Sequence, residues 1–251
     1  MRIALLTDFG TRDPYVAAMK GVIAARTDAA IHDLTHEIEP FDVFAAAWFL
    51  KCVAPWWPRT VLVCVVDPGV GTARKIVALR RGDQLFLAPD NGLLTMITAE
   101  AETVTAVSVE NESLFLPHGS STFHGRDRFA PVAAALANGT PLEVLGPPLA
   151  KLLRLDYSPP DCSRTPVEGT IVHIDRFGNG ITDLDATRIL FPRLVLRLGF
   201  HVISRLSRTY EGEGPFFIIG STGHLEVSFA GASAADVLQF RRGDRVTIVP
   251  S

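Results

Sequence analysis

The sequence predicts an α/β fold in two parts, an N-terminal, mostly parallel α/β domain and a smaller C-terminal all-β domain. In the first 150 residues, apolar runs alternate with segments of helical periodicity, as in a parallel α/β sheet. Beyond that region helical periodicity nearly vanishes, and short strand-like runs follow one another, as in a small β-barrel or sandwich. A stretch rich in Pro, Ser and Asp lies between them, so we place the domains at 1–157 and 166–251, with a linker at 158–165.

The strongest strand signal is the run from Val61 to Val66, which is unbroken, apolar and rich in β-branched residues. Strands buried on both faces of a parallel sheet have this composition. Asp67 follows at the C-terminal end of the strand, the edge at which open α/β sheets bind ligands. Arg74 lies seven residues further on, within reach of Asp67 if the loop folds back. A turn with a surface ion pair explains the stretch equally well, so the pattern alone leaves both interpretations open.

The first predicted strand, residues 2–7, has the same order of residues, because Asp8 follows it directly. Asp13 and Pro14 then precede a segment of helical periodicity. We expect Asp13 to be the N-cap of this helix and Pro14 to occupy its first position.

A second strand is expected within residues 30–38, where polar side chains cluster. A metal site is conceivable there, but no further group of ligands is evident elsewhere, so solvated loop residues are the favoured interpretation. The cluster consists of His32, Asp33, His36 and Glu37.

The remaining segments complete the pattern. In the first domain we predict helices at 41–55, 93–101 and 128–139 and a strand at 104–110. We also predict a hairpin at 75–89 with its turn at 81–83. In the second domain we predict one or two helical turns within 230–240 and strands at 167–175, 180–184, 193–203, 216–221, 224–230 and 244–250.

The composition narrows the function classes. The formal net charge of -3 gives no electrostatic case for nucleic-acid binding, which needs a basic face. No segment reaches about 18 uninterrupted apolar residues, and the N-terminal apolar run is too short for a signal peptide, so we expect a cytoplasmic protein without a membrane span. The cysteines lack metal-ligand spacing, and P-loop, GxGxxG, GxSxG and CxxC motifs are absent. The sequence therefore disfavours phosphoryl transfer, dinucleotide chemistry and serine hydrolysis as functions, and it disfavours a structural zinc site.

His124 stands out because it lies in a polar, glycine-containing loop just before a predicted helix. A helix N-terminus lowers the pKa of a nearby histidine, which would leave the ring neutral at pH 7 and able to accept a proton. A histidine that caps the helix is the alternative, and for a lone histidine it is favoured. Arg126 and Asp127 are expected to pair with each other.

Asp175 and Asn179 flank Gly178 after a predicted strand. The two side chains could hold an amine and the edge of a heteroaromatic ring, since an amide offers both a donor and an acceptor. The same residue types form plain turns, and the spacing alone favours the turn.

Six segments in order closely resemble the S-adenosyl-L-methionine (SAM) hydroxide adenosyltransferases, the water-using relatives of the SAM-dependent fluorinase and chlorinase. The segments are LLTDFGTRDPYVAAMKGVI, DLTHEIEPFDV, VVDPGVGTARK, APDNGLLT, STFHGRDRFAPVAAALA and HIDRFGNGITDL. The resemblance implies an N-terminal α/β domain joined to a C-terminal antiparallel β-barrel-like domain. It also implies a homotrimer that binds SAM at subunit interfaces, between the N-terminal domain of one subunit and the C-terminal domain of the next. The implied reaction converts SAM and water to adenosine and L-methionine by attack at C5′ of the ribose, without a cofactor or a metal.

The resemblance also implies residue roles. The catalytic Asp, Arg and His of the family correspond to Asp67, Arg74 and His124. The substrate-binding positions correspond to Asp8 for the ribose hydroxyls, Asp13 and Asp175 near the methionine portion, Asn179 for adenine, Ser228 for methionine, and the backbone near Ala234 for adenine.

We hypothesise that His124 takes or shares the proton of the water, that Arg74 holds the developing hydroxide, and that Asp67 orients Arg74. A SAM-dependent halogenase (chlorinase) is the nearest rival. The full Asp-Arg-His set and the lack of a surplus segment between Leu94 and Val104 favour the hydrolase. A non-catalytic SAM or adenosine sensor is a third hypothesis, and it would retain ligand without turnover.

Overall fold

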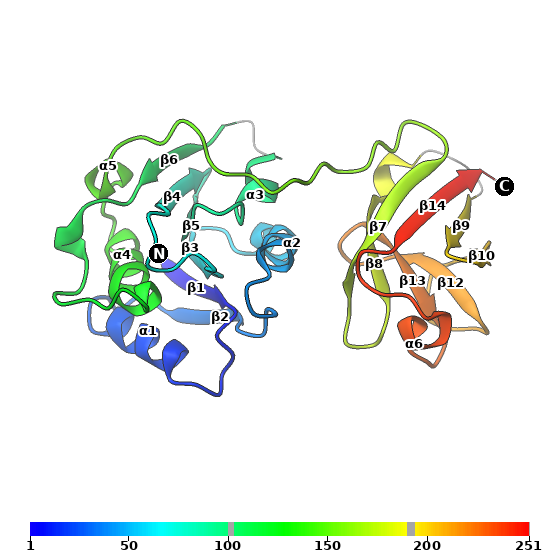
Figure 1. Ribbon diagram of the computed structural model, residues 1–251, viewed down its shortest axis with the longest axis horizontal. Coiled ribbons are helices and arrows are strands. Elements are labelled where there is room, and N and C mark those ends of the chain that lie inside the picture. The colour runs from blue at the N-terminus through cyan, green and yellow to red at the C-terminus, as the bar shows by residue number, and fades with distance from the viewer. Residues whose placement is uncertain (100–102, 190–193, 251) are drawn as a thin grey trace. The chain divides into compact units, whose positions relative to one another are not determined.

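The computed structural model describes residues 1–99, 103–189 and 194–250 of the chain (Figure 1). The chain divides into two compact units, Met1–Asp156 and Tyr157–Ser251. The first unit contains a sheet with helices on both faces, and the second contains a curled sheet that resembles half of a barrel. These architectures confirm the predicted fold class.

Six strands form the sheet of the first unit: β1 (Arg2–Thr7), β2 (Ile31–Thr35), β3 (Thr60–Val65), β4 (Ile76–Arg81), β5 (Gln84–Pro89) and β6 (Thr105–Ser108). Their order is β2-β1-β3-β5-β4-β6, in which the first four pair in parallel while β4 and β6 pair antiparallel. Thr7 of β1 pairs with Val65 of β3. The residues that follow these two strands therefore leave the sheet side by side at one edge.

The helical elements of this unit are α1 (Tyr15–Ala24), α2 (Val43–Val53), α3 (Thr95–Ala99), α4 (Ala130–Ala137) and α5 (Leu142–Leu145), with 3₁₀ turns at Ala54–Trp56 and Glu112–Leu114 and a π-helical turn at Gly125–Phe129. Helices α1 and α4 cover one face of the sheet, and α2 and α3 cover the other (Figure 1). Val61 and Val63 of β3 join the first apolar cluster, whereas Leu62 and Cys64 join the second. Both faces of β3 are thus buried, as its apolar run predicts.

Several of the predicted helix bounds differ from the structure. Pro14 occupies the N-cap of α1 and no side chain caps this helix, so the predicted N-cap role of Asp13 is wrong. Helix α2 begins later than predicted, because the carboxylate of Asp42 caps it by accepting the N–H of Ala45 at 2.8 Å. The helix predicted at 93–101 is present as α3, and its last part, from residue 100, lies outside the described residues.

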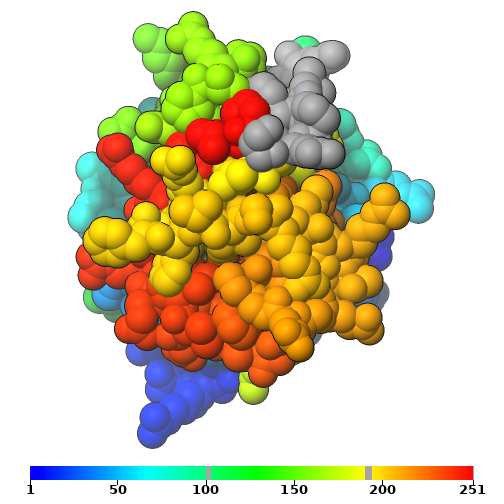
Figure 2. All heavy atoms as spheres, turned by 90° about the vertical axis from the view of Figure 1, so that its right-hand side faces the viewer, coloured from blue at the N-terminus to red at the C-terminus, as the bar shows by residue number. Residues whose placement is uncertain are grey.

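Eight strands form the sheet of the second unit: β7 (Val167–Ile174), β8 (Gly180–Asp185), β9 (Leu194–Leu198), β10 (His201–Ile203), β11 (Leu206–Ser207), β12 (Pro215–Ile219), β13 (His224–Phe229) and β14 (Arg245–Pro250). Their order is β10-β9-β14-β7-β8-β13-β12-β11, and all neighbours pair antiparallel except β11 and β12. The hairpin of β9 and β10 lies beside the segment that contains β12 (Figure 2, yellow and orange).

The second unit has its own apolar core and few helical residues. Its core includes Leu184, Phe217 and Val246. In the described part of this unit, the helical segments are one 3₁₀ turn, Ala186–Arg188, and α6, Ala234–Leu238. The predicted strand at 193–203 is found as β9 and β10, with its first residue outside the described residues. In the described part of the whole chain, no helix has the length and apolar character needed to cross a membrane.

Candidate active site

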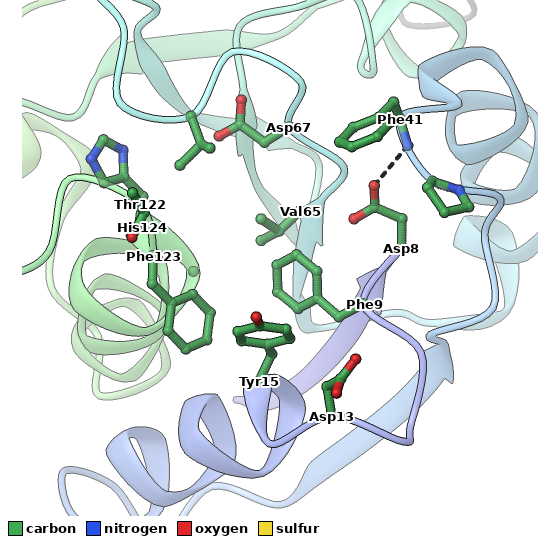
Figure 3. A pocket seen from close by; sticks show the side chains of 13 residues that line it. Asp8, Phe9, Asp13, Tyr15, Phe41, Val65, Asp67, Thr122, Phe123 and His124 are labelled. Carbon is green, nitrogen blue, oxygen red and sulfur yellow. Dashed lines mark hydrogen bonds between the residues drawn. The ribbon is translucent and has the colours of Figure 1, made fainter.

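The loops that follow β1 and β3, together with the segment before α4, line a cavity of about 490 Å³ in the first unit (Figure 3). Its polar lining includes three carboxylates and an imidazole, and its apolar lining includes four aromatic rings. The side chains are those of Asp8, Asp13, Asp67 and His124, and of Phe9, Tyr15, Phe41 and Phe123. The structure therefore places four of the predicted site residues around one cavity.

Arg74 joins Asp67 to His124. Its Nε donates to both oxygens of Asp67, at 2.9 Å to Oδ1 and 2.8 Å to Oδ2, and its Nη2 also donates to Oδ2. The same Nη2 donates to Nδ1 of His124 at 2.9 Å. Asp67 is 9% exposed and His124 is 3% exposed, so these contacts are shielded from bulk water. The three residues form one continuous hydrogen-bonded set beside the cavity.

The hydrogen bond from Arg74 fixes the tautomer of His124. A guanidinium has no acceptor, so Nδ1 accepts and the proton of the neutral ring lies on Nε2. Burial lowers the pKa of His124, and the charges of Arg128 and Arg74 lower it further. These causes differ from the helix N-terminus that the sequence suggested, although their direction is the same. The neutral ring is favoured.

Glycine lets the loop of Arg74 approach the loop of His124. Gly71 has a φ of +78°, and a Cβ at this position would lie 2.7 Å from the carbonyl oxygen of Ser121. Any side chain would therefore push the two loops apart. Gly69 leaves room for Arg74 itself, since a Cβ there would lie 3.3 Å from its Cγ. The glycines of this turn thus help to bring Arg74 and His124 within hydrogen-bonding distance.

Asp8 lies at the other side of the cavity, at the end of β1 (Figure 3). Its Oδ2 accepts the N–H of Phe41 at 2.9 Å. Burial raises the pKa of Asp8, and the hydrogen bond from Phe41 opposes this rise. Phe41 has a φ of +69°, a left-handed conformation that is uncommon for an aromatic residue. No pattern in the sequence indicates that Phe41 meets Asp8.

An aromatic group forms one wall of the cavity. The rings of Phe9, Tyr15 and Phe123 meet edge to face, with centroid distances of 5.1 to 6.0 Å. Sequence reasoning missed all three. The available signal was their position, because Phe9 directly follows Asp8 and Phe123 directly precedes His124.

The predicted pair of Arg126 and Asp127 is confirmed. Nε and Nη2 of Arg126 donate to the two carboxylate oxygens of Asp127 at 2.6 Å and 3.0 Å. Asp127 also accepts the N–H of Ser120 at 2.6 Å, and its carboxylate is buried. This acid therefore ties down the loop that leads to His124.

The polar cluster around β2 differs from the expectation of solvated loop residues. His36 is 4% exposed, and its ring contacts Thr7 Oγ1 through Nδ1 at 2.8 Å and Asp33 Oδ1 through Nε2 at 2.9 Å. The expectation is therefore wrong for His36, which links β2 to the end of β1. Within residues 1–99, 103–189 and 194–250, no group of three His, Cys, Asp or Glu residues could hold a metal ion.

The second unit contains a separate cavity of about 730 Å³, and both Asp175 and Asn179 line it. Oδ1 of Asp175 accepts the N–H groups of Phe177 and Asn179, and Oδ2 accepts Nδ2 of Asn179 at 2.9 Å. The turn that the spacing favours is therefore present, and the side chain of Asp175 stabilises it through these hydrogen bonds. The amide of Asn179 is held in a fixed orientation at the cavity wall.

Ser228 and Ala234 are fully buried. Ser228 Oγ has no hydrogen-bond partner within the described residues, and Ala234 packs in the core at the start of α6. The lining of the cavity includes instead three residues that sequence reasoning did not single out, Tyr210, Ser221 and Glu226.

Two family models match most of the chain. Residues 3–146 match the SAM hydroxide adenosyltransferase N-terminal domain, and residues 169–247 match the SAM hydroxide adenosyltransferase C-terminal domain. The chain belongs to the SAM hydroxide adenosyltransferase family. This result confirms the resemblance seen in the six sequence segments.

Relatives match nearly the whole length of the chain. The (R)-S-adenosyl-L-methionine hydrolase of Salinispora arenicola is 38% identical, over 98% of this chain and 97% of the relative. The hydrolase of the same name from Thermus thermophilus is 40% identical, over 98% of this chain and 99% of the relative. The crystal structure of an uncharacterized conserved protein from Thermotoga maritima superposes with a TM-score of 0.92, at 35% identity, over 98% of this chain and 100% of that one.

A fluorinase from Actinopolyspora mzabensis is a more distant relative, 27% identical over 99% of this chain and 97% of the fluorinase. Its alignment spans 290 residues, whereas that with the Salinispora arenicola hydrolase spans 254. Because this chain has 251 residues, the fluorinase carries segments that the chain lacks. The stretch between Leu94 and Val104, in which the sequence has no surplus segment, includes residues 100–102, which lie outside the described residues.

Proposed function

We propose that this chain hydrolyses SAM to adenosine and L-methionine by attack of water at C5′ of the ribose. The observation that carries the proposal is the hydrogen-bonded set of Asp67, Arg74 and His124 beside an acid-lined cavity. Membership of the family supports it, as do close relatives named (R)-S-adenosyl-L-methionine hydrolase.

The leaving group of this reaction needs no activation by the protein. The new bond joins the water oxygen to C5′, the C5′–S bond breaks, and its electron pair stays on sulfur as a neutral thioether. No acid has to protonate the leaving group, and we propose that neither a metal nor another cofactor takes part. The protein has to supply a better nucleophile than water and a place for one released proton. In a site shielded from water, the developing hydroxide and the sulfonium attract each other more strongly.

The contact between Arg74 and His124 supports a specific place for the water. A water that enters between Nη2 and Nδ1 accepts a hydrogen bond from Arg74 and donates one to His124. In this position Arg74 stabilises the developing hydroxide, and His124 takes the proton on Nδ1 while Nε2 keeps its own. Asp67 holds the guanidinium through two N–H groups and offsets the positive charge that forms on the imidazole.

We propose that Asp8 accepts the ribose hydroxyls, and that Asp13 lies near the methionine portion. The position of both acids in the lining of the cavity supports these roles. The aromatic wall next to them keeps water other than the nucleophile away from C5′. In the second unit, Asn179 is the proposed reader of adenine, because its amide is held in one orientation by Asp175.

We infer a homotrimer from the family resemblance. Phe41 and Phe177 each line one of the two cavities, and they are 69% and 77% exposed. Exposed aromatic side chains at binding cavities support an assembly that covers them. Light scattering on the purified chain should give the mass of a trimer, and a monomer at micromolar concentration would contradict this part of the proposal.

The experiment that tests the function is incubation of the purified chain with SAM, in buffers with and without chloride, followed by chromatography and mass spectrometry of the products. We expect adenosine and L-methionine in equal amounts in both buffers. 5′-Chloro-5′-deoxyadenosine as the main product would identify a halogenase instead. SAM that stays bound and unchanged would identify a sensor.

A further inference from the structure

The turn after β5, residues 90–92, lies between the two ends of the loop that carries Asp67 and Arg74. This β3–β4 loop, residues 66–75, leaves β3 and returns to β4. In the sheet β5 lies between these two strands, parallel to β3 and antiparallel to β4. The C-terminal end of β5 is therefore next to the place where the loop begins and the place where it ends. The turn belongs to the segment APDNGLLT, which has no part in the chemistry proposed above.

Asn91 holds the first end of the β3–β4 loop. Its Nδ2 donates to the carbonyl oxygen of Val66 at 2.9 Å, and Val66 directly precedes Asp67. The paired residues of β3 and β5 end earlier, at Val63 and Leu87. The bond from Asn91 therefore extends the connection between the two strands to the residue next to Asp67.

The amide of Asn91 has one orientation that satisfies both of its contacts. Its Oδ1 accepts the N–H of Leu93 at 3.2 Å, so the atom that faces the carbonyl oxygen of Val66 has to be nitrogen. A carboxylate in the same place would turn one of its oxygens toward the oxygen of Val66. The position thus suits an amide and not an acid of the same shape.

The second end of the loop is held by the backbone of the same turn. The N–H of Asp90 donates to the carbonyl oxygen of Lys75 at 2.9 Å, and Lys75 directly follows Arg74. The two contacts of the turn therefore lie just outside Asp67 and Arg74, one on each side. A shift of either end of the loop changes where the guanidinium points relative to His124.

The turn is itself braced by a later segment of the first unit. Oδ1 of Asp90 accepts the N–H of Leu153 at 2.9 Å, and Oγ1 of Thr95 accepts the N–H of Leu155 at 2.9 Å. Gly92 has a φ of +96°, and a Cβ there would lie 2.9 Å from the backbone nitrogen of Leu155. This close packing keeps the turn from moving away from the β3–β4 loop.

We propose that Asn91 is a positioning residue for the hydrolysis, which fixes the start of the β3–β4 loop and thereby directs Arg74 toward His124. The inference rests on the proposed function and deepens it, because it adds a residue that does not line the cavity of the first unit. A misplacement of about 1 Å in a catalytic group can cost on the order of 10²-fold in rate. Asn91 therefore acts on turnover rather than on substrate binding, for which the proposed acids Asp8 and Asp13 follow β1.

The first test changes the atom that faces Val66. Asn91→Asp keeps the shape of the side chain and the acceptor for Leu93, and it replaces the donor by a carboxylate oxygen. In the full chain we expect kcat for adenosine release from SAM to fall about 10- to 100-fold, while KM changes less than about threefold. Asn91→Ala removes the bond without the repulsion, so it should lower kcat about 3- to 10-fold and serves if Asn91→Asp does not fold.

Asn111 offers a matched control. Its Nδ2 also donates to a backbone carbonyl, that of Val144, at 2.9 Å, and its Oδ1 also accepts the N–H of the residue two positions on, Ser113, at 3.1 Å. These contacts involve the segment after β6 and α5, and not the β3–β4 loop. Asn111→Asp makes the same chemical change and should leave kcat and KM unchanged.

A double-mutant cycle with Arg74→Lys separates positioning from a general loss of stability. If Asn91 acts through the guanidinium, Asn91→Ala should lower kcat by less than about twofold once residue 74 is lysine. A purely structural effect would lower kcat by the same factor in both backgrounds.

Hydrogen exchange measured by mass spectrometry adds a readout that does not need activity. Asn91→Ala should speed exchange of the amides of residues 69–75, and Asn111→Ala should not. An unchanged kcat in a folded Asn91→Asp variant overturns the inference, as do equal losses in Asn91→Asp and Asn111→Asp or a full loss in the Arg74→Lys background. The failure of the proposed function looks different. A wild type that releases no adenosine, with loop exchange that still depends on Asn91, contradicts the hydrolysis and leaves the hold of Asn91 on the loop standing.

Discussion

Arg74 and His124 lie fifty positions apart in the sequence, and a hydrogen bond of 2.9 Å joins Nη2 of the first to Nδ1 of the second. This bond connects the loop after β3, which contains Arg74, to the segment before α4, which contains His124. It also sets the tautomer of the imidazole, because only an unprotonated Nδ1 can accept from a guanidinium. The proposed reaction depends on this geometry, since the water has to replace this bond with two of its own.

Replacing Arg74 by Lys should cost much of the activity. Lysine keeps the charge but cannot donate to Asp67 and His124 at once in the planar arrangement of a guanidinium. We expect kcat to fall about 10²- to 10³-fold while SAM still binds. Stopped-assay kinetics together with equilibrium dialysis of SAM measure the two effects separately, and a kcat near that of the wild type would contradict the role of Arg74.

The pH dependence of kcat/KM should report the protonation of His124. The proposed base acts when neutral, so activity is full above its pKa and is lost as the pH falls through it. Because burial and two arginines lower this pKa, the acid limb should lie below pH 6.5, the ordinary value for histidine.

The same limb can be moved by a change at Arg128. Arg128→Gln removes a positive charge near His124, which makes protonation easier and should shift the limb to higher pH. His124→Ala should abolish the limb along with most of the activity. An Arg128→Gln profile that superposes on that of the wild type would contradict this cause of the shift.

Gly71→Ala should separate the two loops of the site. The new Cβ would meet the carbonyl of Ser121 at 2.7 Å, and the φ of +78° disfavours alanine as well. We expect a loss of about 1–3 kcal/mol in the free energy of unfolding and a lower kcat.

Gly82→Ala is the matched control, because Gly82 has a φ of +58° in the β4–β5 turn and nothing within 4 Å of the added Cβ. It should carry the cost of the backbone conformation alone and leave kcat unchanged. Chemical denaturation and steady-state kinetics measure both variants, and equal effects in the two would rule out a role for the contact with Ser121.

Asp8→Asn should weaken substrate binding more than turnover. The amide keeps the shape of the side chain but loses a charged acceptor for the ribose hydroxyls. We expect KM for SAM to rise about tenfold or more. Inhibition by adenosine should weaken, whereas inhibition by 2′,3′-dideoxyadenosine, which lacks both hydroxyls, should change little. If both nucleosides lose the same affinity, Asp8 does not contact the hydroxyls.

The parts of the fold and the site that depend on neighbouring residues in the chain could be predicted. The apolar run of β3 identified a strand buried on both faces, and Asp67 with Arg74 lies in one short loop after it. The change from helical to strand periodicity identified an all-β second part. The position of His124 beside Arg74 could be expected only from the family resemblance, because no local pattern links loops so far apart.

Other features depend on tertiary contacts that leave no local signal. Asp13 looks like an N-cap, yet Pro14 takes that position and Asp13 lines the cavity instead. A glutamate between apolar neighbours, as at Glu226, is typical of the solvent face of a strand. It is buried here because Tyr210 and Gly220, which precede β13 in the sequence, lie against its carboxylate. Ser228, two residues further on, points to the same face of β13 but is fully buried.

The origin of the oxygen in the product tests the central claim most directly. The purified chain is incubated with SAM in water enriched in ¹⁸O, and the adenosine and the methionine are analysed by mass spectrometry. Attack at C5′ predicts one ¹⁸O atom in the 5′-hydroxyl of adenosine and none in methionine. Adenosine without the label, or methylthioadenosine in place of adenosine, would contradict the attack of water at C5′.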